Sequence, residues 1–327
     1  PFRVGIWEAN VGVLRDEEIT LPEVMKQNGY ATGHFGKWHM GRMVDDKKLS
    51  KKACRMAKAS PDSNGVDDWF AVHSCVSTWN PYGPEGKDAV ESDNPYYHNG
   101  QRVTENVSGD SSRFIMDRAL NFMKKSVKDN KPFLSYIWFN TPHGPISAAP
   151  KWQGVYESKV GKAWAYYGTI TEMDTQVGRL RRTLRDLEIA ENTLIFFTSD
   201  NGPTSHGTAG PYSTGKRHLL EGGIRVPGIV EWPGKITAGS TTDAIGCTTD
   251  YFLTALAAAG IDYKAERPMD GKNILPILLG QQKLRTGNLC FQSHGASIIT
   301  NQKYKAMRFY DGSFSRNAVT AKGFPLN

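Results

Sequence analysis

Residues 193–202 read T-L-I-F-F-T-S-D-N-G, and this stretch decides the fold class. Leu194 to Phe197 form an unbroken apolar run, which is typical of a strand buried on both faces within a parallel sheet. The run ends at Asp200 and Asn201, and open α/β sheets bind their ligands beyond the carboxyl ends of the strands. Both side chains offer the oxygen atoms that Ca²⁺ and Mg²⁺ prefer. The alternative is a plain turn, since Asp-Asn-Gly also favours turns.

Two other predicted strands end in polar residues in the same way. A strand predicted over 30–35 precedes the loop G-K-W-H-M-G at 36–41, and a strand predicted over 133–139 precedes N-T-P-H at 140–143. Glycine permits unusual backbone angles, so a loop flanked by glycines can project its side chains into a cleft. For each motif alone, a surface loop with a stray lysine or histidine is the simpler alternative.

The order of the elements predicts how these strand ends come together. Residues 164–187 carry an apolar stripe at helical spacing between the strands 133–139 and 193–198. Strand, helix and strand in this order favour a right-handed βαβ crossover and a parallel sheet. Residues 203–215 are rich in Gly, Ser and Thr and predict a flexible loop that ends at Lys216. One edge of the sheet is therefore expected to gather Lys37, His39, His143, Asp200, Asn201 and Lys216.

The composition indicates a folded protein with anionic partners. The 327 residues include 39% hydrophobic and 11% aromatic residues, which is ample for a core and argues against disorder. No apolar run reaches the roughly 18 residues that span a bilayer. The net charge of +7 favours nucleic acid, acidic lipid or acidic polysaccharide, with a generic basic surface as the alternative. The basic residues within 47–58 would either line a solvated helix face, which is the commoner case, or help to hold a polyanionic substrate. The aromatic, loop-like stretch 73–100 is consistent with the rim of a substrate site.

The gathered side chains suit the transfer of a tetrahedral anion. Two lysines and two histidines around a cation site make a pocket for an oxyanion, because cations stabilise its charge. A histidine can move a proton to a leaving oxygen, and a metal acts as a Lewis acid. This combination predicts sulfuryl or phosphoryl transfer.

With these motifs in order, the sequence resembles the type I, formylglycine-dependent sulfatases, including the arylsulfatases. The resemblance covers nearly the whole chain. It rests on G-Y-A-T at 29–32 with G-K-W-H-M-G at 36–41, N-G-V-D-D-W-F at 64–70, N-T-P-H at 140–143, T-S-D-N-G at 198–202, and G-K at 215–216 through E-G-G-I-R-V-P at 221–227. Several ordered motifs are far more specific than any one of them. Within 64–70, the resemblance gives Asp67 and Asp68 a structural role and not that of metal ligands.

The resemblance implies an alkaline-phosphatase-like α/β fold, in which helices flank a mostly parallel sheet. A sulfatase catalytic domain would span residues 1–270, and a small C-terminal α+β subdomain would span residues 271–327. The resemblance also implies a bound Ca²⁺, in preference to Mg²⁺, with Asp200 and Asn201 as metal ligands.

For the reaction, the resemblance implies that Lys37 and Lys216 hold the sulfate and neutralise its charge. His143 would contact the ester and help protonate the leaving alcohol. His39 would bind the hydroxyl of the nucleophile and take its proton, which collapses the sulfated intermediate. The protein would then be a sulfuric ester hydrolase. Its expected partner is a sulfated small molecule or glycan, above all a sulfated carbohydrate, and neither nucleic acid nor a membrane.

The chain departs from the family pattern at the nucleophile. In the family this group is a formylglycine made from Cys or Ser in a C/S-x-P/A-x-R motif, which no Cys or Ser of this sequence matches. The family's aspartate pair on the first strand is also missing, and residues 1–5 resemble the family segment just after the nucleophile helix. The expectation is therefore a fragment that begins just after the nucleophile motif, is short of the closing segment of the family, and has no turnover of its own.

Two alternatives stay open at this point. A phosphodiesterase or phosphatase could share the superfold, since one fold hosts many chemistries. A non-catalytic relative could bind sulfated glycans without hydrolysing them. By analogy with the family, the protein is expected to be periplasmic or secreted.

Overall fold

The computed structural model describes residues 6–8, 11–83, 92–105, 107–204, 206–293, 296–301 and 303–309 of the chain. Packing divides the chain into two compact units, an N-terminal unit of residues 1–187 and a C-terminal unit of residues 188–327. This division leaves the predicted domain boundary at residue 270 untested. Residues 1–5, which entered the family resemblance, lie outside the described residues.

The N-terminal unit is built on a five-stranded sheet with the order β6-β5-β4-β3-β7. β3 (Ala31–Lys37) pairs in parallel with β4 (Asp68–Val72) on one side and with β7 (Phe133–Trp138) on the other. β5 (Tyr96–His98) and β6 (Gln101–Arg102) continue the sheet beyond β4 as antiparallel strands. The expected α/β class is confirmed, and the sheet is parallel around β3 and antiparallel at one end.

Two helices of this unit begin where the sequence signals them. α1 (Leu21–Gln27) starts at a capping box, in which the side chains of Thr20 and Glu23 each accept a hydrogen bond from the backbone of the other residue. α3 (Ser111–Lys128) starts after Asp110, whose carboxylate caps the first turn. Local hydrogen bonds therefore fix the start of both helices before tertiary packing is considered.

The core lies on both faces of this sheet. α3 covers one face, where Phe122 packs against Phe35 of β3 with ring centroids 5.6 Å apart. Gly33 lies at this contact, since an added Cβ would come within 2.7 Å of the Phe35 ring and 2.9 Å of the Phe122 ring. Successive residues of a strand point to opposite faces. The other face carries a buried cluster that consists of Trp38, Met43, Leu49, Ala53, Val66, Trp69, Ala71 and Tyr97.

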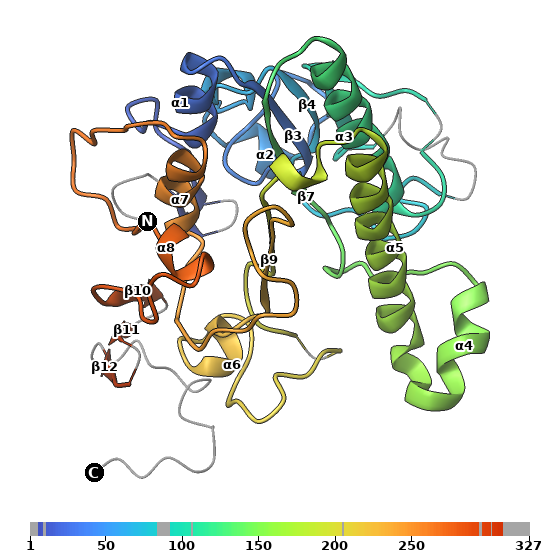
Figure 1. Ribbon diagram of the computed structural model, residues 1–327. Helices are drawn as coiled ribbons and strands as arrows, with labels where there is room; N and C mark the ends of the chain where they lie inside the picture. Colours follow the sequence, from blue (N-terminus) through green and yellow to red (C-terminus); the bar gives the residue numbers. More distant parts are fainter. Residues whose placement is uncertain are drawn as a thin grey trace. The chain divides into compact units, whose positions relative to one another are not determined.

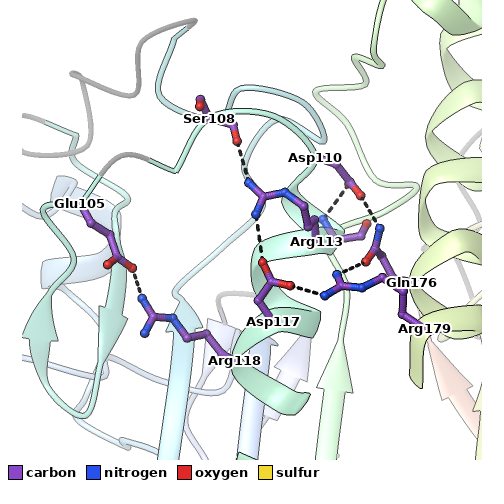
Figure 2. Close-up of polar contacts among 9 residues, drawn as sticks. Glu105, Ser108, Asp110, Arg113, Asp117, Arg118, Gln176 and Arg179 are labelled. Carbon is purple, nitrogen blue, oxygen red and sulfur yellow. Dashed lines mark hydrogen bonds and ion pairs between the residues drawn. The ribbon is translucent and has the colours of Figure 1, made fainter. Parts of the chain in front are cut away.

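A polar network joins α3 to the long helix α5 (Trp164–Asp186), which the sequence predicted. Figure 2 shows Asp117 of α3 accepting a hydrogen bond from Arg179 of α5 at 2.6 Å. Arg179 also donates to Gln176, and the amide of Gln176 donates to Asp110 at the start of α3, at 3.3 Å. These contacts hold the middle of α5 against α3.

The remaining elements of the N-terminal unit are short. α4 (Lys151–Val160) leads through the 3₁₀ turn η3 (Gly161–Ala163) into α5 and packs against it (Figure 1). The others are the antiparallel pair β1 (Ile6–Glu8) and β2 (Val11–Gly12), the helix α2 (Lys51–Cys54) and the 3₁₀ turn η1 (Asp62–Asn64). None of the described helices is both long and apolar enough to cross a bilayer.

In the C-terminal unit, the strand formed by the apolar run after Thr193 pairs differently from the prediction. β8 (Ile195–Thr198) pairs antiparallel with β9 (Gly228–Glu231) in a two-stranded sheet. Among the described residues, β8 has no parallel partner, so the βαβ crossover predicted from β7 through the long helix is not observed as strand pairing. The antiparallel pairing needs a return of the chain between β8 and β9, which the glycine-rich loop provides.

The rest of this unit consists of short elements. β10 (Leu289–Ser293), β11 (Ala296–Thr300) and β12 (Lys305–Phe309) form a three-stranded antiparallel sheet near the C-terminus. The other elements are the 3₁₀ turn η4 (Ala190–Asn192) and the helices α6 (Glu221–Ile224), α7 (Asp250–Ala258) and α8 (Leu275–Leu278).

Candidate functional site

β3 ends at Lys37, the first lysine predicted to hold the anion. The preceding residue, Gly36, has a φ of +118°, and an added Cβ would collide with the backbone carbonyl of Trp138 on β7. Only glycine fits this close approach of the two strands. The Lys37 side chain is half-buried, and no described residue forms an ion pair or hydrogen bond with its ammonium group. A partly buried cation without a counter-charge favours a bound anion.

The loop after β3 holds His39 in a strained backbone conformation. The loop continues along the end of β4, since the Trp38 nitrogen donates to the Val72 carbonyl at 3.0 Å and the His39 nitrogen donates to the His73 carbonyl at 3.1 Å. His39 has a φ of +58°, in the left-handed region that non-glycine residues rarely adopt. Its ring nitrogen Nε2 lies 3.5 Å from the Ser74 hydroxyl. Such strain persists where the surrounding structure holds a side chain in place, often at functional sites.

Sequence reasoning missed His73, which shapes this loop. His73 is buried, and its Nε2 accepts a hydrogen bond of 2.9 Å from the backbone nitrogen of Met43. Burial, and after it the nearby Arg42, lowers the pKa of His73 to about 4. The ring is therefore neutral at pH 7 and can accept this bond. The signal was present, because His73 follows the apolar run W-F-A-V of β4 just as the predicted residues follow theirs.

The end of β7 positions His143 through a tight turn. Asn140 is buried and donates to the Tyr96 hydroxyl at 2.9 Å, and the hydroxyl of Thr141 lies 3.0 Å from another hydroxyl on α3. The backbone nitrogen of His143 donates to the Asn140 carbonyl at 2.8 Å. The His143 Nδ1 lies 2.7 Å from the Gly144 carbonyl oxygen, which can only accept, so Nδ1 carries the proton. Its other nitrogen, Nε2, is left for a ligand on an exposed side chain.

The sheet brings the two strand ends of the N-terminal unit to the same edge. β3 and β7 are parallel neighbours, and their register places Gly36 opposite Trp138. Lys37 therefore comes level with the residue just before Asn140, and the loops that carry His39 and His143 leave the sheet at the same side. The structure thus gathers three of the six predicted residues within one unit.

Two other predicted features of this unit have clear contacts. Asp67 pairs with Lys26 at 2.6 Å and accepts from the Thr32 backbone and hydroxyl, both at 3.1 Å. Asp68 lies 3.0 Å from the His98 ring. These contacts agree with a structural role for both carboxylates. In the basic stretch 47–58, Lys58 pairs with an aspartate at 3.6 Å, so part of this charge is already balanced.

In the C-terminal unit, β8 ends in the predicted metal ligands. The Asp200 side chain is exposed and has no partner among the described residues. The Asn201 side-chain nitrogen donates to the Gly202 carbonyl at 2.8 Å, which leaves its side-chain oxygen free. The Ser199 hydroxyl donates to the Asn201 backbone carbonyl at 3.0 Å and closes the turn. The carboxylate and the amide oxygen are therefore both open to a hard cation.

Backbone contacts bring Lys216 beside this turn. The Gly202 nitrogen donates to the Gly223 carbonyl at 2.8 Å, and the Lys216 nitrogen donates to the Pro203 carbonyl at 2.9 Å. The residues on both sides of Gly215-Lys216 are strained, since Thr214 has a φ of +71° and Arg217 a φ of +78°. The Lys216 side chain is half-buried, and no described residue pairs with its ammonium group. The second group of predicted residues is thus gathered within the C-terminal unit.

The donor chemistry fits a hard cation in part. Ca²⁺ takes 6–8 oxygen ligands, and Asp200 and Asn201 supply two kinds of side-chain oxygen. Among the described residues, no three His, Cys, Asp or Glu side chains cluster into a metal site. The Ca²⁺ site, and the meeting of the two groups of residues at one site, stay predictions.

Comparisons with known proteins point to one family. Residues 4–261 match the family model described as Sulfatase, and residues 212–313 match the model described as N-sulphoglucosamine sulphohydrolase, C-terminal. The chain is 31% identical over 330 residues to N-acetylgalactosamine-6-sulfatase of Canis lupus familiaris, in a match that covers 94% of this chain and 59% of the relative. The chain thus spans about three fifths of the length of this curated relative.

Two solved structures share the fold. The crystal structure of Ps i-CgsB in complex with k-i-k-neocarrahexaose matches with a TM-score of 0.75 and 25% identity, over 94% of this chain and 72% of that chain. The structure of BT4656 in complex with its substrate D-glucosamine-2-N,6-O-disulfate matches with a TM-score of 0.70 and 20% identity, over 95% of this chain and 76% of that chain. The expected alkaline-phosphatase-like fold is confirmed.

Proposed function

Because the chain belongs to the sulfatase family, we propose that it carries the anion-binding and metal-binding residues of an enzyme that hydrolyses sulfate esters of a sulfated carbohydrate. One observation carries the proposal: the parallel neighbours β3 and β7 bring Lys37, whose ammonium has no partner among the described residues, and the loop with His143 to one edge of the sheet. The relatives that act on or bind sugars support the carbohydrate as substrate.

Lys37 and Lys216 would bind the sulfate group. Each is half-buried and free of a described counter-charge. A charge-assisted hydrogen bond from an ammonium to an anionic oxygen is about twice as strong as a neutral one. Negative charge also builds up on the oxygens around sulfur as the ester bond breaks, and fixed cations stabilise that charge most when water is excluded.

His143 would protonate the leaving alcohol. Its Nδ1–H is held by the Gly144 carbonyl, which fixes the ring and directs Nε2 away from the backbone. A ring protonated on both nitrogens would give the Nε2 proton to the ester oxygen as the bond to sulfur breaks. The hydrogen bond to the carbonyl keeps the ring in this orientation, because Nδ1 is a donor in both forms of the ring.

His39 would accept a proton from the nucleophile, whereas His143 would give one to the leaving alcohol. In the family, a formylglycine supplies the attacking hydroxyl, and no Cys or Ser of this sequence matches the motif from which it forms. By the family resemblance, His39 would bind a hydroxyl of such a group and accept a proton from it. Its left-handed backbone fixes the direction in which the ring leaves the loop.

Asp200 and Asn201 would hold Ca²⁺. The ion would add positive charge beside the sulfate oxygens, in the same sense as the two lysines. The exposed carboxylate and the free amide oxygen would be two of its ligands, and further oxygens are needed to complete the shell. By family analogy, we also propose a periplasmic or secreted location.

Binding of a sulfated sugar tests the proposal directly, because binding depends on the proposed anion-binding residues and not on a nucleophile. Isothermal titration of the full chain in Ca²⁺ compares N-acetylgalactosamine 6-sulfate with N-acetylgalactosamine. We expect the sulfated sugar to bind more tightly, and Lys37→Ala or Lys216→Ala to weaken it by about tenfold or more. Lys124→Ala, at an exposed site of α3, is the matched control and should have no effect. Equal affinity for both sugars, or no effect of Lys37→Ala, would contradict the assignment.

A further inference from the structure

The hairpin of α4, η3 and the start of α5 leaves an aromatic surface uncovered. We call residues 151–167 the hairpin surface. No residue of α4 is buried, although this ten-residue helix carries Trp152, Val155, Tyr156 and Val160. Figure 1 shows α4 beside the first part of α5, beyond the part that α3 contacts. Contiguous apolar surface that stays in contact with water can mark a site that binds a partner.

Aromatic rings form a continuous row across this surface. The ring centroids of Trp152 and Tyr156 lie 6.2 Å apart, and those of Tyr156 and Tyr167 lie 6.0 Å apart, each pair with an interplanar angle of 35°. Tyr166 extends the row, since its centroid lies 5.7 Å from that of Tyr167. The Tyr167 side chain is exposed, at 37% of its full area. The row therefore crosses from α4 to α5 and includes the exposed ring of Tyr167, which a ligand can reach.

The row is held in place from below. The Trp152 indole donates to the Glu172 carboxylate at 2.9 Å, and the Tyr156 hydroxyl lies 2.7 Å from the Thr171 hydroxyl. A residue larger than glycine does not fit at position 168, because an added Cβ would come within 2.7 Å of the Trp152 Cβ. Rings fixed before binding lose little conformational freedom when a ligand arrives, and this favours affinity.

Positive charge surrounds the row. The Lys151 ammonium lies 4.8 Å from the Trp152 ring centroid, in a cation–π contact. Lys159 and Lys162 are exposed, and neither pairs with an acid in the described part of the chain. The sequence between residues 141 and 171 contains a single acidic residue, Glu157. The surface thus combines flat apolar rings with a net positive charge.

We propose that the hairpin surface binds a sulfated glycan chain, through residues other than those at the strand ends. The rings would pack against the apolar faces of the sugar rings, and the lysines would pair with sulfate groups. The anionic charge of the ligand follows from the lysines, and its carbohydrate class rests on the proposed function. The surface would hold a polymer while a single sulfate ester is presented to the site.

Binding of polymers to the full chain tests this proposal. Isothermal titration at low salt compares chondroitin 6-sulfate, desulfated chondroitin and polyglutamate, which carries charge without sugar. We expect chondroitin 6-sulfate to bind most tightly of the three. Tyr167→Ser should weaken this binding by about fivefold or more. Lys159→Gln with Lys162→Gln should weaken it by a similar factor that shrinks as salt is added.

Matched control variants distinguish binding at the hairpin surface from nonspecific binding elsewhere on the protein. Tyr304→Ser removes another exposed aromatic ring, in the C-terminal unit, and should leave binding unchanged. The ammonium of Lys303 lies 5.2 Å from the centroid of this ring, so the ring also has a lysine beside it. Lys124→Gln with Lys128→Gln removes the same charge from α3 and should also have no effect. Circular dichroism and thermal midpoints confirm that each variant is folded.

Several results would overturn the proposal. Polyglutamate or a single-stranded oligonucleotide that binds as tightly as chondroitin 6-sulfate would mean that charge alone, or a nucleic acid, is recognised. Self-association that Tyr167→Ser abolishes would assign the surface to a second copy of the chain. Lys37→Ala, measured with the sulfated monosaccharide, reports on the proposed function separately, so either proposal can fail while the other stands.

Discussion

Replacing His34 should change how the stability of the N-terminal unit depends on pH. His34 lies on β3, is fully buried, and packs among the rings of Trp38, Trp138 and Tyr136, with centroids 5.1, 4.9 and 6.4 Å away. Neither of its ring nitrogens has a hydrogen-bond partner among the described residues. Burial lowers the pKa of His34 from 6.5 to about 3, and the backbone of Lys37 offsets only part of this shift.

The size of the effect follows from the two pKa values. The unfolded chain takes up a proton on this ring below pH 6.5, whereas the folded protein does so only near pH 3. The stabilisation from the neutral ring is therefore complete above pH 6.5 and is lost as the pH falls toward 3. At pH 5 the loss is about 2 kcal/mol, because one pKa unit corresponds to about 1.4 kcal/mol. His73 acts in the same direction, while burial raises the pKa of Asp110 and of Glu172, which act in the opposite direction.

The assay compares the wild-type chain with His34→Leu at pH 8 and at pH 5. Hydrogen exchange of the β3 amides, corrected for intrinsic rates, gives the opening free energy of this sheet without contribution from the C-terminal unit. The opening free energy of wild type should fall by about 2 kcal/mol more than that of His34→Leu when the pH is lowered from 8 to 5. Phe35→Leu, a buried change on the same strand without a proton to bind, should cost the same at both pH values. A His34→Leu effect that does not change with pH would refute the reasoning.

Two further predictions concern single contacts. Asp250→Asn should destabilise the C-terminal unit by about 3–5 kcal/mol, because it leaves the fully buried Arg285, now bound to Asp250 at 2.8 and 3.0 Å, without its counter-charge. Urea unfolding followed through the α7 amides measures this, and a loss below about 1 kcal/mol would show that the pair behaves as an exposed one. Gly36→Ala should cost more than Gly29→Ala, since both glycines have positive φ but only Gly36 faces a backbone carbonyl, that of Trp138. Thermal unfolding of the two variants compares them, and equal midpoints would contradict the close approach of β3 and β7.

The strand ends were predictable because their signals are local. The strands that precede His143 and Asp200 read as largely apolar runs, and the strand that ends at Lys37 precedes a loop flanked by glycines. In the structure these strands end at Trp138, Thr198 and Lys37. The capping box of α1 is equally local. Such patterns depend on neighbouring residues only, so a single sequence contains them.

The features that the sequence did not predict depend on contacts between distant residues. The hydrogen bond from Met43 to His73 needs the parallel pairing of β3 with β4, and that from Asn140 to Tyr96 joins residues 44 positions apart. The hairpin surface was missed for a related reason. The apolar stripe of α5 was expected to face the core, but it reaches beyond α3, so Tyr167 is exposed. Periodicity indicates which residues share a face, and the length of the covering element decides how much of that face is buried.

The distribution of unpaired charge and backbone strain argues that these strand ends are functional. In the C-terminal unit, the buried Asp250 is balanced by the buried Arg285 at 2.8 Å. At the strand ends, by contrast, the half-buried Lys37 and Lys216 have no described partner, and His39 adopts a left-handed backbone that costs about 1–2 kcal/mol. A fold selected for stability alone would remove such costs one at a time, since each can be relieved by a single substitution. The occurrence of strain and unpaired charge together in the segments that carry Lys37 and Lys216 therefore favours the proposal that a bound ligand offsets these costs.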